Sequence, residues 1–359
     1  MTFLLSRVAG ATLGAALLVA ASAHAQTVET VASGLNNPRG LAFAPNGDLY
    51  VAEAGIGGNE YCHRGPTGDR CFGKTGAIVK LDLRRGTRET VIAGLPSMAA
   101  TGGAAATGPH DVSFQGQGNL FVTIGFGGAP DLRAVLGPES GTMAVLGRVT
   151  SNGGYRIVSD IGTFEGAENP DGGPPDNNLA DTNPYGVLAL PGKVVVADAG
   201  ANALFEIAAD GAIRTLAVFH DQPFPGGPPR DAVPTTVVQG PDGDYYVSQL
   251  TGGPFTVGAA KVFRVPAEGG VPEPVLQGFT NVIDIAVGPD GSLYVLQIAE
   301  PLFNFATGKL IRVAPDGTPT PLNVALFAPG GIAIAKDGTI YVTNRSVVPG
   351  GGEVLAIRE

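Results

Sequence analysis

The chain lacks the features by which membrane proteins, nucleic-acid-binding proteins and many enzymes are recognised. Beyond residue 25, no stretch approaches the roughly 18 uninterrupted apolar residues of a membrane-spanning helix. The 22 Lys and Arg residues form no cluster and are outnumbered by 32 Asp and Glu residues, which leaves a formal net charge of −10. Because such a surface repels phosphate backbones, we expect no nucleic-acid partner.

Familiar catalytic signatures are absent as well. The sequence has no Gly-x-Ser-x-Gly elbow, no His-Glu-x-x-His and no Gly-x-x-x-x-Gly-Lys-Ser/Thr, which counts against serine hydrolases, zinc proteases and nucleotide-driven enzymes. Residues 169–186 are rich in Asn and Asp but do not follow the ligand order of an EF-hand loop. We interpret most of that segment as a surface loop.

Cysteine is scarce, because only Cys62 and Cys71 occur, with eight residues between them. In an exported chain, oxidation of such a pair is the default outcome. The alternative is a metal site that includes His63, but Cys-x8-Cys is not a zinc spacing. We therefore predict a disulfide that pins the loop between the two cysteines.

The first 25 residues have the pattern of a secretory signal peptide. Arg7 precedes an apolar run over residues 8–21, and Ala23-His24-Ala25 fits the small-x-small site of a signal peptidase. The apolar run is too short to span a membrane. We therefore expect a mature chain of residues 26–359 that has no membrane span and is exported, either to the periplasm or out of the cell.

Glycine and proline are abundant, with 55 and 29 residues in 359, which leaves little room for long helices. Between them, a short run of β-forming residues divided by a tight turn recurs six times. The copies lie at residues 41–51, 111–122, 187–196, 236–247, 283–295 and 331–342. Long repeats of short strands and tight turns are typical of a β-propeller. The sequence predicts an all-β, six-bladed propeller that forms one domain over residues 26–359.

The two ends of the chain complement each other in this scheme. The last repeat stops after a strand expected at residues 353–357 and has no outer strand, while a β-rich segment at residues 27–32 is left over before the first repeat. We predict that this N-terminal strand pairs as the outer strand of the last blade. That pairing closes the ring and removes an exposed sheet edge.

Loop lengths distinguish the two faces of the expected disc. The links between the first and second strands of each blade are short turns, and so are those between the third and fourth strands. All long insertions fall at the opposite ends of the strands, at residues 55–76, 96–109, 125–141, 162–183, 220–234, 251–260, 300–308 and 346–352. Neutral drift also lengthens loops, but binding sites concentrate in loops on a rigid scaffold. We expect function on this long-loop face.

Polar side chains should ring the central channel on the long-loop face. They flank the first two strands of the blades and are Arg39, Glu53, His110, Asp111, Tyr185, Asp198, Gln249, Asp284, Gln297 and Asn344. Such a ring fits a ligand site, and it equally fits a water-filled channel. His110 is the best candidate for moving a proton, the alternative being a histidine that caps a loop.

Carboxylates in this ring suggest a hard cation. Glu53, Asp198 and Asp284 supply oxygen ligands of the kind that Ca2+ or Mg2+ prefers. Asp residues that follow a strand also form turns for local reasons, so turn chemistry is the alternative interpretation.

Four blocks of the sequence resemble a known family. They are Gly-Leu-Asn-Asn-Pro-Arg-Gly at 34–40, Pro-Asn-Gly-Asp-Leu-Tyr-Val at 45–51, Asn-Pro-Tyr-Gly at 183–186 and Val-Ala-Asp-Ala-Gly-Ala-Asn at 196–202. They are similar to the ScyD/ScyE family of exported propellers, which is related to NHL-repeat and gluconolactonase-like propellers. The resemblance covers essentially the whole mature chain and implies a propeller without implying a reaction.

Two enzyme relatives of that family bear on the site. Gluconolactonase-like enzymes hold a divalent metal with a Glu at the start of the first inner strand, where this chain has Arg39. The resemblance therefore does not carry lactonase activity over directly. Streptogramin lyases use a His with Mg2+, and the position of His110 is compatible with that arrangement.

The sequence supports two hypotheses about function. In the first, the propeller binds a small molecule or an extracytoplasmic protein on its long-loop face, with Arg39 and Tyr185 as anchors and Gln249, Gln297 and Asn344 as further contacts. In the second, it is a divalent-metal-dependent hydrolase or lyase. There, Glu53, Asp198 and Asp284 hold the ion and His110 moves a proton. A monomer is expected in both cases.

Overall fold

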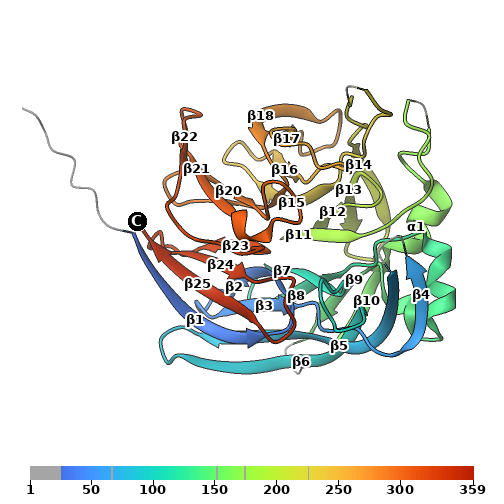
Figure 1. The fold of residues 1–359 in the computed structure, drawn as a ribbon, viewed down its shortest axis with the longest axis horizontal. Coiled ribbons are helices and arrows are strands. Elements are labelled where there is room, and N and C mark those ends of the chain that lie inside the picture. Colours follow the sequence, from blue (N-terminus) through green and yellow to red (C-terminus); the bar gives the residue numbers. More distant parts are fainter. Residues whose placement is uncertain (1–25, 66–67, 151–152, 174, 225) are drawn as a thin grey trace, which may run out of the picture.

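Six antiparallel sheets surround a central axis, which makes the chain a six-bladed β-propeller, as the repeats predict (Figure 1). The computed structural model describes residues 26–359 apart from 66–67, 151–152, 174 and 225. The predicted signal peptide of residues 1–25 lies outside the described residues.

Within each blade the chain runs from the inner strand outwards. Blade 1 contains β2 (Pro38–Phe43), β3 (Leu49–Glu53), β4 (Glu60–Gly65), β5 (Gly68–Asp82) and β6 (Thr87–Ala100). Blade 2 contains β7 (Pro109–Gln115), β8 (Asn119–Ile124), β9 (Val145–Val149) and β10 (Tyr155–Asp160), and blade 3 contains β11 (Pro184–Leu190), β12 (Lys193–Asp198), β13 (Ala203–Ala208) and β14 (Ile213–Val218).

The second half of the ring repeats this order. Blade 4 contains β15 (Pro234–Gln239), β16 (Tyr245–Gln249), β17 (Ala260–Val265) and β18 (Glu273–Phe279), and blade 5 contains β19 (Val282–Val287), β20 (Leu293–Gln297), β21 (Lys309–Val313) and β22 (Pro319–Pro321). Blade 6 contains β23 (Gly331–Ile334), β24 (Ile340–Asn344), β25 (Gly352–Arg358) and β1 (Thr27–Leu35). The described helices are α1 (Ile161–Glu168), η1 (Pro130–Leu136), η2 (Ser140–Thr142) and η3 (Phe305–Thr307).

Glycines in the left-handed region make the short turns between inner strands. Gly47 has φ 90° and Gly243 has φ 88°. In the first turn, the amide of Gly47 donates to the carbonyl oxygen of Ala44 over 2.9 Å. Glycine reaches such φ values without steric cost, which is why Asn-Gly and Asp-Gly mark these turns in the sequence.

The hydrophobic core lies between neighbouring blades. Tyr50 of blade 1 meets Phe114 of blade 2 with ring centroids 4.9 Å apart, and Phe43 of blade 1 meets Tyr341 of blade 6 at 5.4 Å. Each inner sheet therefore buries both of its faces. This explains why β12 reads Val-Val-Val-Ala in its middle instead of alternating apolar and polar residues.

The N-terminal strand closes the ring as predicted. β1 pairs with β25 in antiparallel register, from Thr27 opposite Arg358 to Leu35 opposite Gly352. Figure 1 shows β1 along the outer side of β25, at the seam where the two ends of the chain meet. The last blade is thus built from both ends of the propeller, and β25 has no open edge.

Blade 1 is longer than the sequence indicates. Residues 55–76 are predicted as a loop, but they contain β4 and the first part of β5, which pair as a hairpin. β5 is 15 residues long and β6 is 14, so both continue beyond the inner strands of the blade. The segment has few strand-forming residues, and its strand β5 also pairs with β6, which supplies a third strand.

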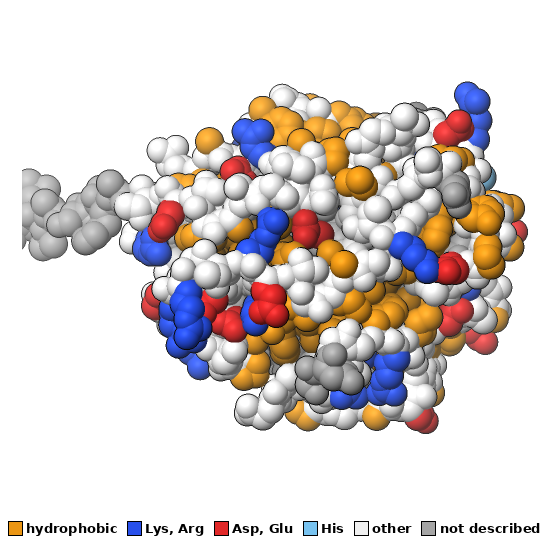
Figure 2. All heavy atoms as spheres, turned by 90° about the horizontal axis from the view of Figure 1, so that it is seen from below, with side chains coloured by type: hydrophobic (Ala, Val, Ile, Leu, Met, Phe, Trp, Pro, Cys, Tyr) orange, Lys and Arg blue, Asp and Glu red, His pale blue; other side chains and the backbone are white. Residues whose placement is uncertain are grey.

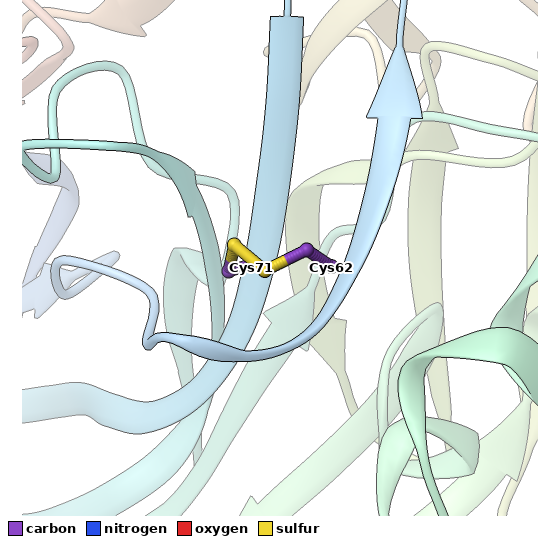
Figure 3. Close-up of a disulfide and its surroundings, with 2 residues drawn as sticks. All are labelled: Cys62 and Cys71. Atoms are coloured by element: carbon purple, nitrogen blue, oxygen red, sulfur yellow. A yellow bond between two sulfur atoms is a disulfide. The ribbon is translucent and has the colours of Figure 1, made fainter.

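The predicted disulfide joins this hairpin. Cys62 on β4 and Cys71 on β5 stand opposite each other, with their Cα atoms 4.0 Å apart (Figure 3). The two residues are nine positions apart in the sequence. The bond therefore closes a short ring within one local element.

Replacing both cysteines by serine should lower the melting temperature by only a few degrees. A ring of this length restrains the unfolded chain by about 2–3 kcal/mol at most, and the hairpin keeps its pairing with β6. We would compare melting curves of the Cys62→Ser/Cys71→Ser variant with those of the wild type with and without reductant. Global unfolding of the variant at 25 °C would contradict a purely local role.

One side of the rim carries charges of both signs. Seen from the side where β1, β5 and β6 lie, basic and acidic side chains are interspersed around an apolar area (Figure 2). In the part of the chain that the structure describes, no helix is both long and apolar enough to cross a bilayer.

Candidate functional site

Six equivalent positions stand at the start of the inner strands, two residues before a buried or nearly buried aliphatic side chain. Arg39, His110, Tyr185, Thr235, Ile283 and Gly330 occupy them. Proline precedes five of the six, and its fixed φ and missing amide hydrogen suit the first residue of a strand. The three large polar side chains come from the consecutive blades 1, 2 and 3.

His110 and Tyr185 are in contact. Their ring centroids are 4.5 Å apart at an interplanar angle of 40°, and His110 is only 3% exposed. Nδ1 of His110 lies 3.2 Å from the carbonyl oxygen of Pro184, which can only accept, so Nδ1 carries the hydrogen. Nε2 therefore holds the lone pair, and the buried hydroxyl of Tyr185 has no close hydrogen-bond partner other than the nearby guanidinium of Arg39.

Two arginines lie near these rings. Nη2 of Arg39, a residue 7% exposed, donates to the carbonyl oxygen of Ala106 over 2.7 Å. Nη2 of Arg70 on β5 donates to Oγ1 of Thr107 over 2.7 Å and to the carbonyl oxygen of Met98 over 3.2 Å. Both Nε atoms are buried without a partner. Both guanidinium groups thus donate hydrogen bonds to uncharged oxygen atoms of the same short segment, Arg39 at Ala106 and Arg70 at Thr107.

The positive charge of these arginines affects the pKa of His110. Burial lowers the pKa of His110 to about 3, and the positive charges of Arg39 and Arg70 act in the same direction. Burial also lowers the pKa of Arg70, with a further contribution from Arg39. His110 is therefore neutral at neutral pH, and an anion that compensated the arginines would raise its pKa.

Arg70 is the member of this group that sequence reasoning missed. It belongs to the segment 55–76, which the sequence shows only as an insertion. The extension of β5 and β6 carries it to residues 105–107, next to the inner end of the site. The one feature of the sequence that could have indicated a fixed position for Arg70 is that it directly precedes Cys71, which the disulfide anchors.

Asp111 and Asp284 lie one residue further along the inner strands of blades 2 and 5. Each carboxylate joins its own strand to the inner strand of the next blade by accepting two backbone amides. The donors are Val112 at 2.8 Å and Val187 at 2.9 Å for Asp111, and Ile285 and Ile332 at 2.7 Å each for Asp284. Burial raises the pKa of Asp284 to about 7, and burial together with the charge of Asp284 raises the pKa of Asp111.

These raised pKa values predict a fall in stability with rising pH. An unfolded Asp titrates near 3.9, so between about pH 4 and pH 7 the folded chain binds a proton at Asp284 that the unfolded chain has lost. The stabilisation is complete at the acid end and is lost as the pH rises through about 7. The free energy of unfolding should therefore decrease between pH 5 and pH 8 by an amount on the order of 1–3 kcal/mol from this group.

Urea unfolding of the wild type and of Asp284→Asn at pH 5, 6, 7 and 8 measures this effect. The variant should have a smaller slope with pH. Asp290→Asn is the control, because hydrogen bonding to Arg312 lowers the pKa of Asp290 to about 2, outside this range. Equal slopes for the wild type and Asp284→Asn would contradict the assignment.

Four of the predicted ring residues bond to the scaffold. Glu53, Asp198, Gln297 and Asn344 end the second strand of their blades, and each accepts the backbone amide of a residue 15–17 positions earlier. The donors are Asn36, Asn183, Thr280 and Phe327, at 2.6, 2.6, 2.9 and 2.8 Å. Each bond ties the crossover between blades to the end of a strand, which accounts for these polar side chains without a ligand, apart from Nε2 of Gln297, which is buried without a partner.

Gln249 ends the second strand of blade 4 and differs from those four residues. It is 1% exposed, and neither Oε1 nor Nε2 has a hydrogen-bond partner. An unsatisfied buried amide costs free energy, so it is a candidate for bonding a ligand.

The three predicted metal ligands do not form one centre. Glu53, Asp198 and Asp284 belong to blades 1, 3 and 5, and each accepts at least one backbone amide. Across residues 26–359, gaps excepted, no group of three or more His, Cys, Asp or Glu side chains is arranged as a ready-made metal site.

Solved structures share this architecture. No protein-family profile matches the chain, and no curated protein sequence matches it. A virginiamycin B lyase from Staphylococcus aureus is similar over 93% of this chain and 100% of its own, with 12% identity and a TM-score of 0.52. A gluconolactonase from Xanthomonas campestris matches over 93% and 90%, with 12% identity and a TM-score of 0.54. A glucose dehydrogenase matches over 93% and 99%, with 13% identity and a TM-score of 0.55.

Identities this low show the fold alone. The chain is a six-bladed propeller with the architecture that these lactonase, lyase and dehydrogenase structures share. Membership of the ScyD/ScyE family stays a prediction.

Proposed function

We propose that this protein is an exported propeller of the ScyD/ScyE type that binds a small anionic ligand at the channel mouth, on the long-loop face. The observation that supports this most is the pair Arg39 and Arg70. Their guanidinium groups influence each other, have unpartnered Nε atoms and bond only neutral oxygens among the described residues. Because a buried charge is costly unless it is paired, a carboxylate or phosphate that accepts from both groups fits this site.

The rings beside the arginines favour a planar ligand. His110 and Tyr185 present a tilted pair of aromatic rings, and Tyr185 packs against the same hydrophobic cluster as Phe305 and Phe327. The buried hydroxyl of Tyr185 and the unpartnered amide of Gln249 can bond polar groups of the ligand. An aromatic carboxylate combines both properties.

Residues 101–107 cover the arginines. This segment, Thr-Gly-Gly-Ala-Ala-Ala-Thr, has no large side chain. It is held by Arg39, which donates to the carbonyl oxygen of Ala106, and by a hydrogen bond of 3.2 Å from the backbone amide of Ala105 to the carbonyl oxygen of Val347. An anion that took over the hydrogen bonds of the arginines would loosen this cover. We therefore expect ligand entry to displace residues 101–107.

A hydrolase or lyase is the second candidate. The lone pair on Nε2 of His110 favours it, because a neutral imidazole can accept a proton while the nearby arginines stabilise developing negative charge. With a pKa of about 3, His110 is a weak base until an anionic substrate compensates the arginines. Substrate binding would thus activate the base. The neighbouring structures named as a lyase and a gluconolactonase are consistent with this class.

A thermal-shift screen with benzoate, citrate and inorganic phosphate tests the binding proposal. Benzamide is the matched control for benzoate, because it has the same ring and no charge. We expect at least one anion to raise the melting temperature and benzamide to leave it unchanged. His110→Asn separates the two candidates: it should keep the shift with inorganic phosphate, which has no ring to pack against the imidazole, and it should abolish turnover if the protein is an enzyme. If no anion raises the melting temperature at millimolar concentration, the proposal fails.

A further inference from the structure

A second group of acidic side chains surrounds the segment that links blades 2 and 3. Helix α1 begins at the cap Asp160, whose Oδ1 accepts the amide of Thr163 over 2.9 Å, and it ends at Asn169 with φ 39°. The following residues are predicted as a surface loop, but Asp171 is only 2% exposed. Part of this segment is therefore buried against the propeller.

Side-chain amides shape the segment. Nδ2 of Asn169 donates to the carbonyl oxygen of Asn178 over 2.9 Å. Oδ2 of Asp171 accepts from Nδ2 of Asn178 at 3.0 Å and from Nδ2 of Asn202 at 2.8 Å. The loop is thus built around a buried carboxylate by neutral donors.

Two buried carboxylates here have unsatisfied oxygens. Glu165 on α1 is 0% exposed, and its carboxyl group has no side-chain donor among the described residues, so that the backbone of Asp181 is the one hydrogen-bonding group that acts on it. Oδ1 of Asp171 is also buried without a partner. Burial raises the pKa of Glu165 to about 8, and the nearby carboxylates of Asp198, Asp171 and Asp181 act in the same direction. These carboxyl groups therefore lie close enough to influence one another, and Glu165 keeps its proton at neutral pH unless a cation compensates the charge.

A pocket opens beside this cluster and is lined by two of its carboxylates, Asp171 and Asp181. It has a volume of about 360 Å³, and Asp171, Asp181 and Asp231 line it together with Asn178, Asn183 and Asn202. Asp181 is solvent-exposed, and its carboxylate lies against Gly200, just after the end of β12. A Cβ atom at position 200 would lie 2.7 Å from Oδ1 of Asp181, too close for a side chain. Because Gly200 has no side chain, there is room for the carboxylate of Asp181 at this position.

We propose that a divalent cation of the Ca2+ type binds at this pocket, held by Glu165, Asp171 and Asp181. A hard cation pairs with carboxylate and amide oxygens, and it removes the cost of burying uncompensated negative charge. Ca2+ accepts six to eight oxygens in irregular geometry, whereas Mg2+ requires a small, regular octahedron, so an Asp- and Asn-rich loop suits Ca2+. Among the described residues the carboxylates do not form a ready-made centre, so the ion would have to draw them together on binding.

Calorimetric titration of chelator-treated protein with CaCl2, together with melting curves with and without Ca2+, tests this site. The variants are Glu165→Gln, which keeps the shape of the buried side chain, and Asp181→Asn, which changes an exposed residue and so preserves the fold. Asp131→Asn is the matched control, because Asp131 is an exposed carboxylate on η1 outside the pocket.

We expect the wild type and Asp131→Asn to bind about one Ca2+ with a rise in melting temperature. Glu165→Gln and Asp181→Asn should each bind at least about tenfold more weakly. Without Ca2+, Glu165→Gln should melt at or above the wild-type temperature, because it removes a buried carboxyl group that has no side-chain donor. Failure of the wild type to bind millimolar Ca2+ would overturn the proposal, and so would wild-type affinity in either Asp181→Asn or a folded Glu165→Gln.

Discussion

A chain of residues 36–359 should melt more than about 10 °C below a chain of residues 26–359, and it should aggregate on heating. Residues 27–35 form β1, which pairs with β25 at seven positions. The free energy of unfolding should fall by about 1 kcal/mol for each hydrogen bond between β1 and β25. The lost burial of Leu35, which is 0% exposed, should add about 1.5–3 kcal/mol. A sum above about 5 kcal/mol is a large part of the stability of a typical domain. The bare edge of β25 would also be free to pair with other chains.

Three further variants make this prediction specific. Leu35→Ala should cost about 2–5 kcal/mol, because it leaves a cavity in the cluster that contains Val354 and Leu41. Val28→Thr should have little effect, because Val28 is 48% exposed. Moving residues 27–35 behind Glu359 should restore stability, because the strand can still pair with β25. Melting curves and light scattering measure all of these effects, and a truncated chain that melts like the complete one would contradict closure by β1.

Replacing Arg39 or Arg70 by glutamine should weaken binding of whichever anion gives the largest thermal shift by about 10- to 100-fold. Each substitution removes a charge-assisted hydrogen bond to the anion, worth about 1.5–3 kcal/mol. Arg39→Lys should lose less, because it keeps the charge and gives up only the planar donor fork. Arg156→Gln is the control, because Arg156 is exposed on β10. Titration calorimetry measures the affinities.

A second measurement separates a binding role of Arg39 from a role in folding. Because the charge of Arg39 lowers the pKa of His110, Arg39→Gln should raise that pKa, and NMR titration of the imidazole can follow it. The melting temperature should change by only a few degrees, since the lost bond to Ala106 is offset by removal of a buried unpaired charge. A large fall in melting temperature with unchanged anion affinity would show that the guanidinium serves the fold.

Most of the architecture could be predicted from local patterns. The Asn46-Gly47 turn and its equivalents mark the hairpins, because only a few residues adopt positive φ at low cost. The spare strand at residues 27–32 indicated the closure. The hairpin of β4 and β5 was missed, because a Gly-rich segment has no strand signal of its own. Its strand β5 also pairs with β6, and the Cys62–Cys71 bond joins its two strands.

The candidate site was predicted less completely. Arg39, His110 and Tyr185 could be found because they occupy one position of the repeat, before a buried residue of each inner strand. Glu53 and Asn344 look the same in the sequence as ligand-binding residues. The amides they accept come from residues 17 positions earlier, and only the folded crossover brings them there.

The sequence by itself determined the number of blades, the closure by the N-terminal strand, the disulfide and the face that carries the long loops. These depend on residue types at fixed local spacing, since strands, turns and a short disulfide ring are local objects. The tertiary structure decided which polar side chains lack partners. Arg70 comes near enough to Arg39 to influence it, and Glu165 near enough to Asp171 and Asp181, only because distant segments pack together. Burial and uncompensated charge, the two properties that point to ligands here, are properties of that packing.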